Sequence, residues 1–151
     1  MSDSLIIIPT FNEKENIEKI IRKVFSLEKL FHILIVDDGS PDGTATIVKK
    51  LQSQFPNQLH IQERAGKLGL GTAYIHGFKW ALQRDYQFIF EMDADFSHNP
   101  DDLIRLYNAN LLDGGELAIG SRYVKGVNIV NWPMSRLLMS FFASKYVKMI
   151  T

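Results

Sequence analysis

Two aspartates one residue apart, Asp93 and Asp95, end the apolar segment Phe88–Met92. Side chains at positions i and i+2 of an extended chain project from the same face, so we expect the two carboxylates to point together. Such carboxylates repel each other unless a cation lies between them. Mg²⁺ and Mn²⁺ are bound in this way, through one or two carboxylates together with substrate phosphates. The pair therefore predicts a divalent metal site that also contacts a diphosphate.

An Asp-x-Asp triplet taken in isolation is more often a solvated turn than a metal site. Its position after an apolar strand favours the metal interpretation, because open α/β sheets bind ligands at the carboxyl ends of their strands. Residues 96–102 read as a loop and a helix start, with no competing structural use for both acids. His98 lies in this loop and is a minor candidate; the other three histidines show no ligand spacing.

Apolar β-type runs alternate with segments of helical period along the whole chain. We predict strands at residues 5–8, 33–36, 60–62, 88–92 and 116–119. Helices are predicted over residues 17–25, from a cap at Thr44 through Leu51, over 70–81 and around 103–107. Continuous apolar strands indicate a sheet covered on both faces. The sequence thus predicts an α/β protein with a doubly wound, mostly parallel sheet and right-handed crossovers.

Polar residues follow four of the predicted strands, which favours one shared site at the carboxyl edge of the sheet. The four segments are Pro9-Thr10-Phe11-Asn12-Glu13, Asp37-Asp38-Gly39-Ser40, Asp93-Ala94-Asp95 and Gly120-Ser121-Arg122. The stretch Arg64–Ala73 adds basic residues and glycines before a helix start, where phosphate can bind. It matches neither a P-loop nor a dinucleotide fingerprint, so a mobile glycine loop is its default interpretation.

Composition limits the classes of function. The chain has 151 residues, of which 46% are hydrophobic and 23% charged, as in a soluble globular domain. A formal net charge of zero gives no support for a nucleic-acid partner. The absence of cysteine excludes disulfides and fits a cytoplasmic location. We expect neither a signal peptide nor a membrane-spanning helix.

Five ordered blocks resemble the family-2 glycosyltransferases with a Rossmann-like GT-A fold, most closely the polyprenol- or dolichyl-phosphate mannosyltransferase branch. The blocks are Pro9–Asn16, Asp37–Thr44, Lys67–Gly71, Asp93–His98 and Gly120–Val124, and Trp132, Pro133 and Arg136 fit as well. The resemblance implies a nucleotide-sugar donor, with GDP-mannose expected, and a lipid monophosphate as acceptor. It also implies an inverting transfer assisted by Mg²⁺ or Mn²⁺.

The resemblance further implies roles for single residues. Donor contacts would come from Pro9, Phe11, Glu13, Asp37 or Asp38, Lys67, Gly69, Asp93 and Ala94. Asp93 and Asp95 would hold the metal, and Ser97 stands where the family can have a glutamine ligand; a hydroxyl is a weaker ligand, and water can substitute. Asp95, Arg122 and Arg136 are the expected catalytic residues. The acceptor phosphate is already an anion and needs no base, so the two arginines would bind and orient it.

Residues 133–150 read as a helix with a wide apolar face. This face suits a core or homodimer helix as well as an in-plane helix at the cytoplasmic membrane face, beside a lipid acceptor. We expect a single domain over residues 1–151 that is truncated on its acceptor side, because the sequence stops at Thr151 without a cap or polar tail.

Two variants of the transferase hypothesis stay open. The enzyme could use a UDP-sugar and a glycan or protein hydroxyl, which would require a general base that the sequence does not identify. The chain could also bind a donor without turnover. A response-regulator-like receiver is disfavoured, because that class needs its acidic pair on the first strand and its phosphoacceptor aspartate on the third.

Overall fold

The structure is a computed structural model that describes residues 2–120 and residues 139, 143 and 146. The chain separates into two compact units, Met1–Ala118 and Ile119–Thr151. The predicted helix over 133–150 lies outside the described residues except at positions 139, 143 and 146, which are helical. Arg122 and Arg136 also lie outside them. The expectation of a single domain stays a prediction.

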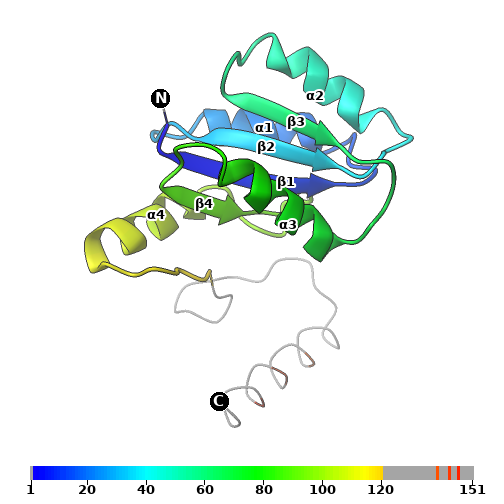
Figure 1. Ribbon diagram of the computed structural model, residues 1–151. Helices are drawn as coiled ribbons and strands as arrows, with labels where there is room; N and C mark the ends of the chain where they lie inside the picture. The colour runs from blue at the N-terminus through cyan, green and yellow to red at the C-terminus, as the bar shows by residue number, and fades with distance from the viewer. Residues whose placement is uncertain (1, 121–138, 140–142, 144–145, 147–151) are drawn as a thin grey trace. The chain divides into compact units, whose positions relative to one another are not determined.

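Parallel strands alternate with helices throughout the first unit (Figure 1). The sheet order is β3-β2-β1-β4, and each neighbouring pair is parallel. Strands β1, β2 and β3 follow one another outward, whereas β4 lies on the other side of β1. The strand order therefore reverses between β1 and β4, which is the switch point where open α/β sheets bind ligands. The elements are β1 (Ser4–Thr10), α1 (Ile17–Phe25), β2 (His32–Asp37), α2 (Thr44–Gln52), β3 (Leu59–Glu63), α3 (Leu70–Ala81), β4 (Phe88–Glu91) and α4 (Asp102–Asp113).

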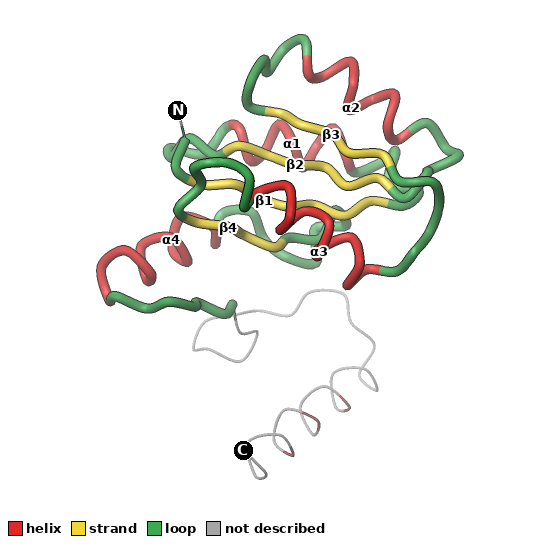
Figure 2. The backbone as a smooth tube through the Cα atoms, viewed as in Figure 1, coloured by secondary structure: helices red, strands yellow, loops and turns green. Residues whose placement is uncertain are grey.

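Helices cover both faces of the sheet (Figure 2), which confirms the predicted doubly wound α/β architecture. Helices α1, α2 and α4 pack on one face, against a cluster that includes Ile6, Ile8 and Ile35. Helix α3 packs on the other face, against Ile7 and its neighbours. Alternate residues of each central strand thus enter opposite layers, which explains why these strands are apolar without interruption.

Gly77 allows α3 to approach β1 closely. A Cβ atom at this position would lie 2.6 Å from Cγ2 of Ile7. We expect Gly77→Ala to lower the free energy of unfolding by about 1–3 kcal/mol, because the added carbon overpacks the interface. Gly71→Ala in the same helix is the matched control, since its Cβ would meet no atom within 4 Å. Urea denaturation should show no loss for the control, and equal losses would contradict the close packing.

Two histidines face each other near the amino ends of β2 and β3. The ring centroids of His32 and His60 are 6.0 Å apart, and Nδ1 of His32 lies 2.8 Å from the hydroxyl of Tyr86. The indole of Trp80 and the guanidinium of Arg84 border the same cluster. Burial lowers the pKa of both imidazoles, and for His60 the positive charges of His32 and Arg84 add to the effect.

This cluster predicts a loss of stability in mild acid. The folded-state pKa values lie below the ordinary value of 6.5, so the unfolded chain binds protons first as the pH falls. The contribution is complete above pH 6.5 and is lost progressively below it. We expect the urea midpoint to decrease between about pH 7.5 and about pH 5.5. The double variant His32→Gln/His60→Gln should have a flatter profile, and an unchanged slope in that variant would contradict the assignment.

Two predicted local features are wrong. Residues 116–119 form no strand, and Leu117 is 77% exposed. A strand requires a neighbour that supplies N–H and C=O groups, and a short run of three apolar residues, Leu117 to Ile119, does not specify one. Thr44 is the first residue of α2 rather than its cap. Its hydroxyl donates to Asp42 at 2.7 Å and accepts the backbone N–H of Glu13 at 3.0 Å.

Candidate functional site

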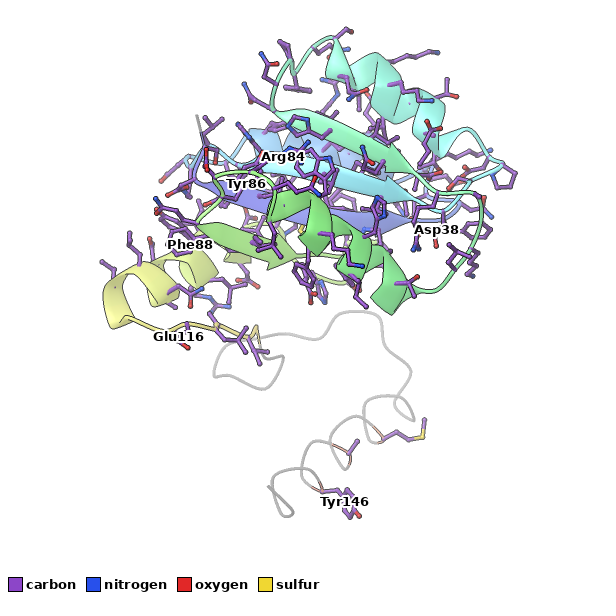
Figure 3. All side chains as sticks on the ribbon, in the orientation of Figure 1. Asp38, Arg84, Tyr86, Phe88, Glu116 and Tyr146 are labelled. Atoms are coloured by element: carbon purple, nitrogen blue, oxygen red, sulfur yellow. The ribbon has the colours of Figure 1, made fainter. Side chains whose placement is uncertain are left out.

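The polar segments that follow β1, β2 and β4 lie at one edge of the sheet. Thr10 at the end of β1 is in register with Asp37 at the end of β2, and the N–H of Met92 after β4 donates to the carbonyl of Ile7 at 3.2 Å. Figure 3 shows Asp38 at this end of the sheet, whereas Tyr86 and Phe88 lie at the other end. The structure thus brings together three of the four predicted segments. Ser121 and Arg122 of the fourth lie outside the described residues.

Asp37 fixes the turn after β2. Its carboxylate accepts the hydroxyl of Thr10 at 2.9 Å, the hydroxyl of Ser40 at 2.6 Å and the N–H of Ser40 at 2.9 Å. The residue is 1% exposed, so its oxygens are engaged inside the protein. This geometry favours Asp38, rather than Asp37, as the acid that faces a ligand.

Asp38 forms a buried ion pair with Arg64. Nε and Nη2 of Arg64 donate to the two carboxylate oxygens at 2.6 and 2.7 Å, and each side chain is 8% exposed. Nη1 of Arg64 also donates to Oγ1 of Thr72 at 2.8 Å, while the N–H of Leu68 donates to Asp38 at 3.2 Å. The glycine-containing segment 64–72 is therefore tied to the end of β2 through several contacts, in contrast to the default interpretation of a mobile loop.

A pocket of about 110 Å³ lies between the end of β1 and the start of α3. The ammonium group of Lys67 is 4.8 Å from the ring centroid of Phe11, a cation–π contact. A ring, a cation and the Asp38 carboxylate are thus side by side, a combination that can stack a base and bind hydroxyl or phosphate groups. The lining residues are Pro9, Thr10, Phe11, Asp38, Lys67, Gly69, Leu70 and Ala73, which include five predicted donor-binding residues.

Glu13 lies in the turn before α1, beside the loop that precedes α2. Its carboxylate accepts the side-chain N–H of Asn16 at 3.1 Å, and its N–H donates to Thr44 at 3.0 Å. A larger open groove of about 520 Å³ between α1 and α4 contains none of the predicted site residues. The smaller pocket is therefore the better candidate, because it contains five of them and lies at the carboxyl ends of β1 and β2.

Asp93 and Asp95 lie in a loop rather than on an extended strand, so the geometric basis of the sequence prediction is wrong. Strand β4 ends at Glu91, and the N–H of Ser97 donates to Oδ1 of Asp95 at 2.9 Å. Such a side-chain bond to the backbone two residues later competes with extended structure. Both acids still contact the same residue, Ser97. Its N–H binds Asp95, and its Oγ lies 3.5 Å from Oδ2 of Asp93.

Asp93 is held by neighbours on two sides. The hydroxyl of Tyr74 on α3 donates to Oδ1 of Asp93 at 3.1 Å, and Nδ1 of His98 accepts the N–H of Asp93 at 3.2 Å. Burial and the adjacent carboxylate raise the pKa of Tyr74, so its hydroxyl keeps its proton and donates the hydrogen bond to Asp93. Ala94 is 4% exposed and packs in the core beneath the loop, so it supports the loop rather than offering a side chain to a ligand.

The chemistry of this loop suits a hard divalent cation. Burial opposes ionisation of Asp95, but hydrogen bonds from Ser97 outweigh it and lower the pKa of the carboxyl group. In the described part of the chain, no group of three or more acidic, histidine or cysteine side chains could hold a metal. A cation would therefore need Asp93, Asp95 and further oxygen ligands such as Ser97, water or a phosphate. Mg²⁺ sites have this composition, so the residues fit the expected metal.

Arg64, Thr72 and Tyr74 belong to the site although no motif assigned them a role. Arg64 and Thr72 stand within the basic, glycine-containing stretch, where their partners cannot be read from spacing. Tyr74 occupies a position on the apolar face of a predicted helix. A buried tyrosine hydroxyl generally has a hydrogen-bond partner, and that rule is the signal that could have identified it.

Residues 5–150 match the family described as glycosyl transferase family 2. A polyprenol monophosphomannose synthase from Mycolicibacterium smegmatis is 47% identical over 97% of this chain and 55% of that protein. An undecaprenyl-phosphate mannosyltransferase from Micrococcus luteus is 42% identical over 97% of this chain and 59% of that protein. This chain thus spans little more than half the length of these two relatives.

The solved structures confirm the fold class. A mannosyltransferase from Pyrobaculum calidifontis, PcManGT, in complex with GDP-Man and Mn²⁺, superposes with a TM-score of 0.50 and 24% identity. The similarity covers 52% of this chain and 24% of that one. Within the described residues of this chain, no helix has the length and apolar character needed to cross a membrane.

Proposed function

The chain belongs to glycosyl transferase family 2, and from that premise we propose that it binds GDP-mannose and transfers mannose to a polyprenyl or dolichyl phosphate with inversion. The observation that carries the proposal is the pocket at the carboxyl ends of β1 and β2, which places Phe11, Lys67 and Asp38 beside one another. The names of the two relatives support the acceptor class, and the GDP-Man complex of the structural neighbour supports the donor.

The pocket would receive the nucleoside part of the donor. The ring of Phe11 offers a stacking surface, and Asp38, whose position is fixed by Arg64, accepts hydrogen bonds from ribose or base. Gly69 lines the same pocket, and Glu13, in the turn before α1, is a further proposed donor contact. Lys67 carries the positive charge that a diphosphate requires. These residues would orient the donor with its diphosphate toward the loop after β4, residues 93–98, which we call the acidic loop.

Asp93 and Asp95, with Ser97 or water, would hold Mg²⁺ or Mn²⁺ on the diphosphate. A cation held by these residues would supply positive charge against the charge that develops on the departing nucleoside diphosphate. The acceptor phosphate is an anion near neutral pH and attacks without a general base. Arg122 and Arg136 would bind and orient it against the anomeric carbon, because a planar guanidinium matches the geometry of a phosphate group.

A polyprenyl phosphate resides in a membrane, so the proposed reaction requires peripheral contact with one. The apolar segment 133–150 is the proposed contact, on the cytoplasmic face, and a homodimer through the same segment is the competing use. Flotation with vesicles that contain polyprenyl phosphate distinguishes the two, because only membrane contact carries the protein to the lipid fraction.

Calorimetric titration tests the proposal. GDP-mannose, UDP-glucose and UDP-GlcNAc are each titrated with and without Mn²⁺, followed by a transfer assay with radiolabelled GDP-mannose and polyprenyl phosphate. We expect GDP-mannose to bind, and to bind more tightly with Mn²⁺. Preference for a UDP-sugar would favour the hydroxyl-acceptor alternative, and binding without transfer would identify a donor-binding chain. Failure of every nucleotide sugar to bind in the presence of metal would refute the proposal.

A further inference from the structure

Tyr74 stands between the body of the fold and the acidic loop. It belongs to the second turn of α3, a helix that Gly77 seats directly against β1 and that buries Ala73 at 1% exposure. Its hydroxyl reaches out of this packed layer and donates to Oδ1 of Asp93 at 3.1 Å. A group on a well-packed helix thus contacts a carboxylate on a turn that is itself exposed around residues 95–98.

The contact determines which oxygen of Asp93 faces the loop. Because Oδ1 is engaged by Tyr74, the other oxygen, Oδ2, lies toward Oγ of Ser97 at 3.5 Å and Nε2 of His98 at 3.9 Å. The backbone of Asp93 is also held, since its N–H donates to Nδ1 of His98. The side chain of Asp93 therefore presents its second oxygen, Oδ2, in a defined direction, toward Ser97, whose N–H also binds Asp95.

We propose that Tyr74 is a positioning residue, which orients the carboxylate of Asp93 so that Oδ2 is presented to the divalent cation. This inference rests on the proposed function, in which Asp93 is a metal ligand. Partners that orient metal ligands commonly change metal affinity or activity by about 10- to 100-fold when they are mutated. The phenol ring packs against the apolar cluster that includes Leu5 and Ile7, a contact that phenylalanine would keep, so the hydroxyl group carries the effect.

Tyr74→Phe removes the hydroxyl and retains the ring. Tyr107→Phe is the matched control, because Tyr107 also donates its hydroxyl to an aspartate, Asp3, at 2.9 Å, in a cluster with Lys29 rather than in the acidic loop. Mn²⁺ binding is measured by electron paramagnetic resonance of the free ion in the presence of GDP, and GDP binding without metal by calorimetry. Thermal melting of all variants reports on folding.

We expect Tyr74→Phe to weaken Mn²⁺ binding by about tenfold while metal-free GDP binding stays at the wild-type level. Tyr107→Phe should bind Mn²⁺ as the wild type does, even if it melts at a lower temperature. Wild-type Mn²⁺ affinity in Tyr74→Phe, with binding lost in Asp93→Ala, would overturn the role of Tyr74 and leave the metal site standing. Absence of Mn²⁺ binding in the wild-type protein would overturn both.

Discussion

Asp95→Asn should abolish the metal-dependent part of donor binding and slow mannose transfer on the order of 100- to 1,000-fold. The estimate follows because a bound cation contributes several kcal/mol to stabilising the transition state and each ~1.4 kcal/mol corresponds to a factor of ten. Asparagine keeps an oxygen that can accept the N–H of Ser97, the bond that shapes the turn at 2.9 Å. The substitution thus removes the charge while preserving the loop.

Asp85→Asn is the control, because Asp85 is an exposed aspartate in the turn after α3, away from the acidic loop. Calorimetry with GDP-mannose and Mn²⁺, a transfer assay and thermal melting are applied to both variants. The melting temperature of Asp95→Asn should match the wild type, since Asp95 is itself exposed. Mn²⁺-stimulated donor binding at the wild-type level in this variant would remove Asp95 from the metal site.

The sheet was predictable because its evidence is local and repeated. The helix predicted over residues 17–25 from apolar spacing is α1, Ile17–Phe25, and the four strands predicted before residue 93 correspond to β1, β2, β3 and β4. The failure at residues 116–119 shows the limit of such patterns. An apolar run indicates that its burial is favourable. Whether it forms a strand also depends on a neighbouring strand to pair with, which the run itself does not specify.

The acidic candidates could be located because parallel strands present their carboxyl ends at one edge. The hydrogen-bond partners of these acids could not be located from the sequence, because they depend on distances in the folded state. Arg64 stands 26 residues from Asp38, and Tyr74 stands 19 residues from Asp93. Geometry also separated Asp37 from Asp38, which are equivalent by type and position in the sequence. Only the folded structure shows that Asp37 is enclosed by Thr10 and Ser40.

Arg64→Ala should lower the free energy of unfolding by about 3–5 kcal/mol, the usual consequence of removing one partner of a buried ion pair. The carboxylate of Asp38 would remain in an environment where it is 8% exposed, with the N–H of Leu68 at 3.2 Å as its remaining contact among those described above. The segment 64–72 would also lose its anchor at Thr72. Donor binding should weaken with it, since Asp38 and Lys67 line the same pocket.

Arg22→Ala provides the comparison for this variant, because Arg22 pairs with Glu18 at 2.8 Å on the surface of α1, where the side chains are 46% and 50% exposed. An exposed pair of this kind contributes about 0.3–0.5 kcal/mol. Arg64→Lys should fall between, because an ammonium group keeps the charge but cannot span both oxygens of Asp38 and reach Thr72. Urea denaturation of the three variants ranks their losses in the free energy of unfolding. Equal losses in Arg64→Ala and Arg22→Ala would show that solvent already screens the Asp38 pair and that Arg64 does not hold the pocket together.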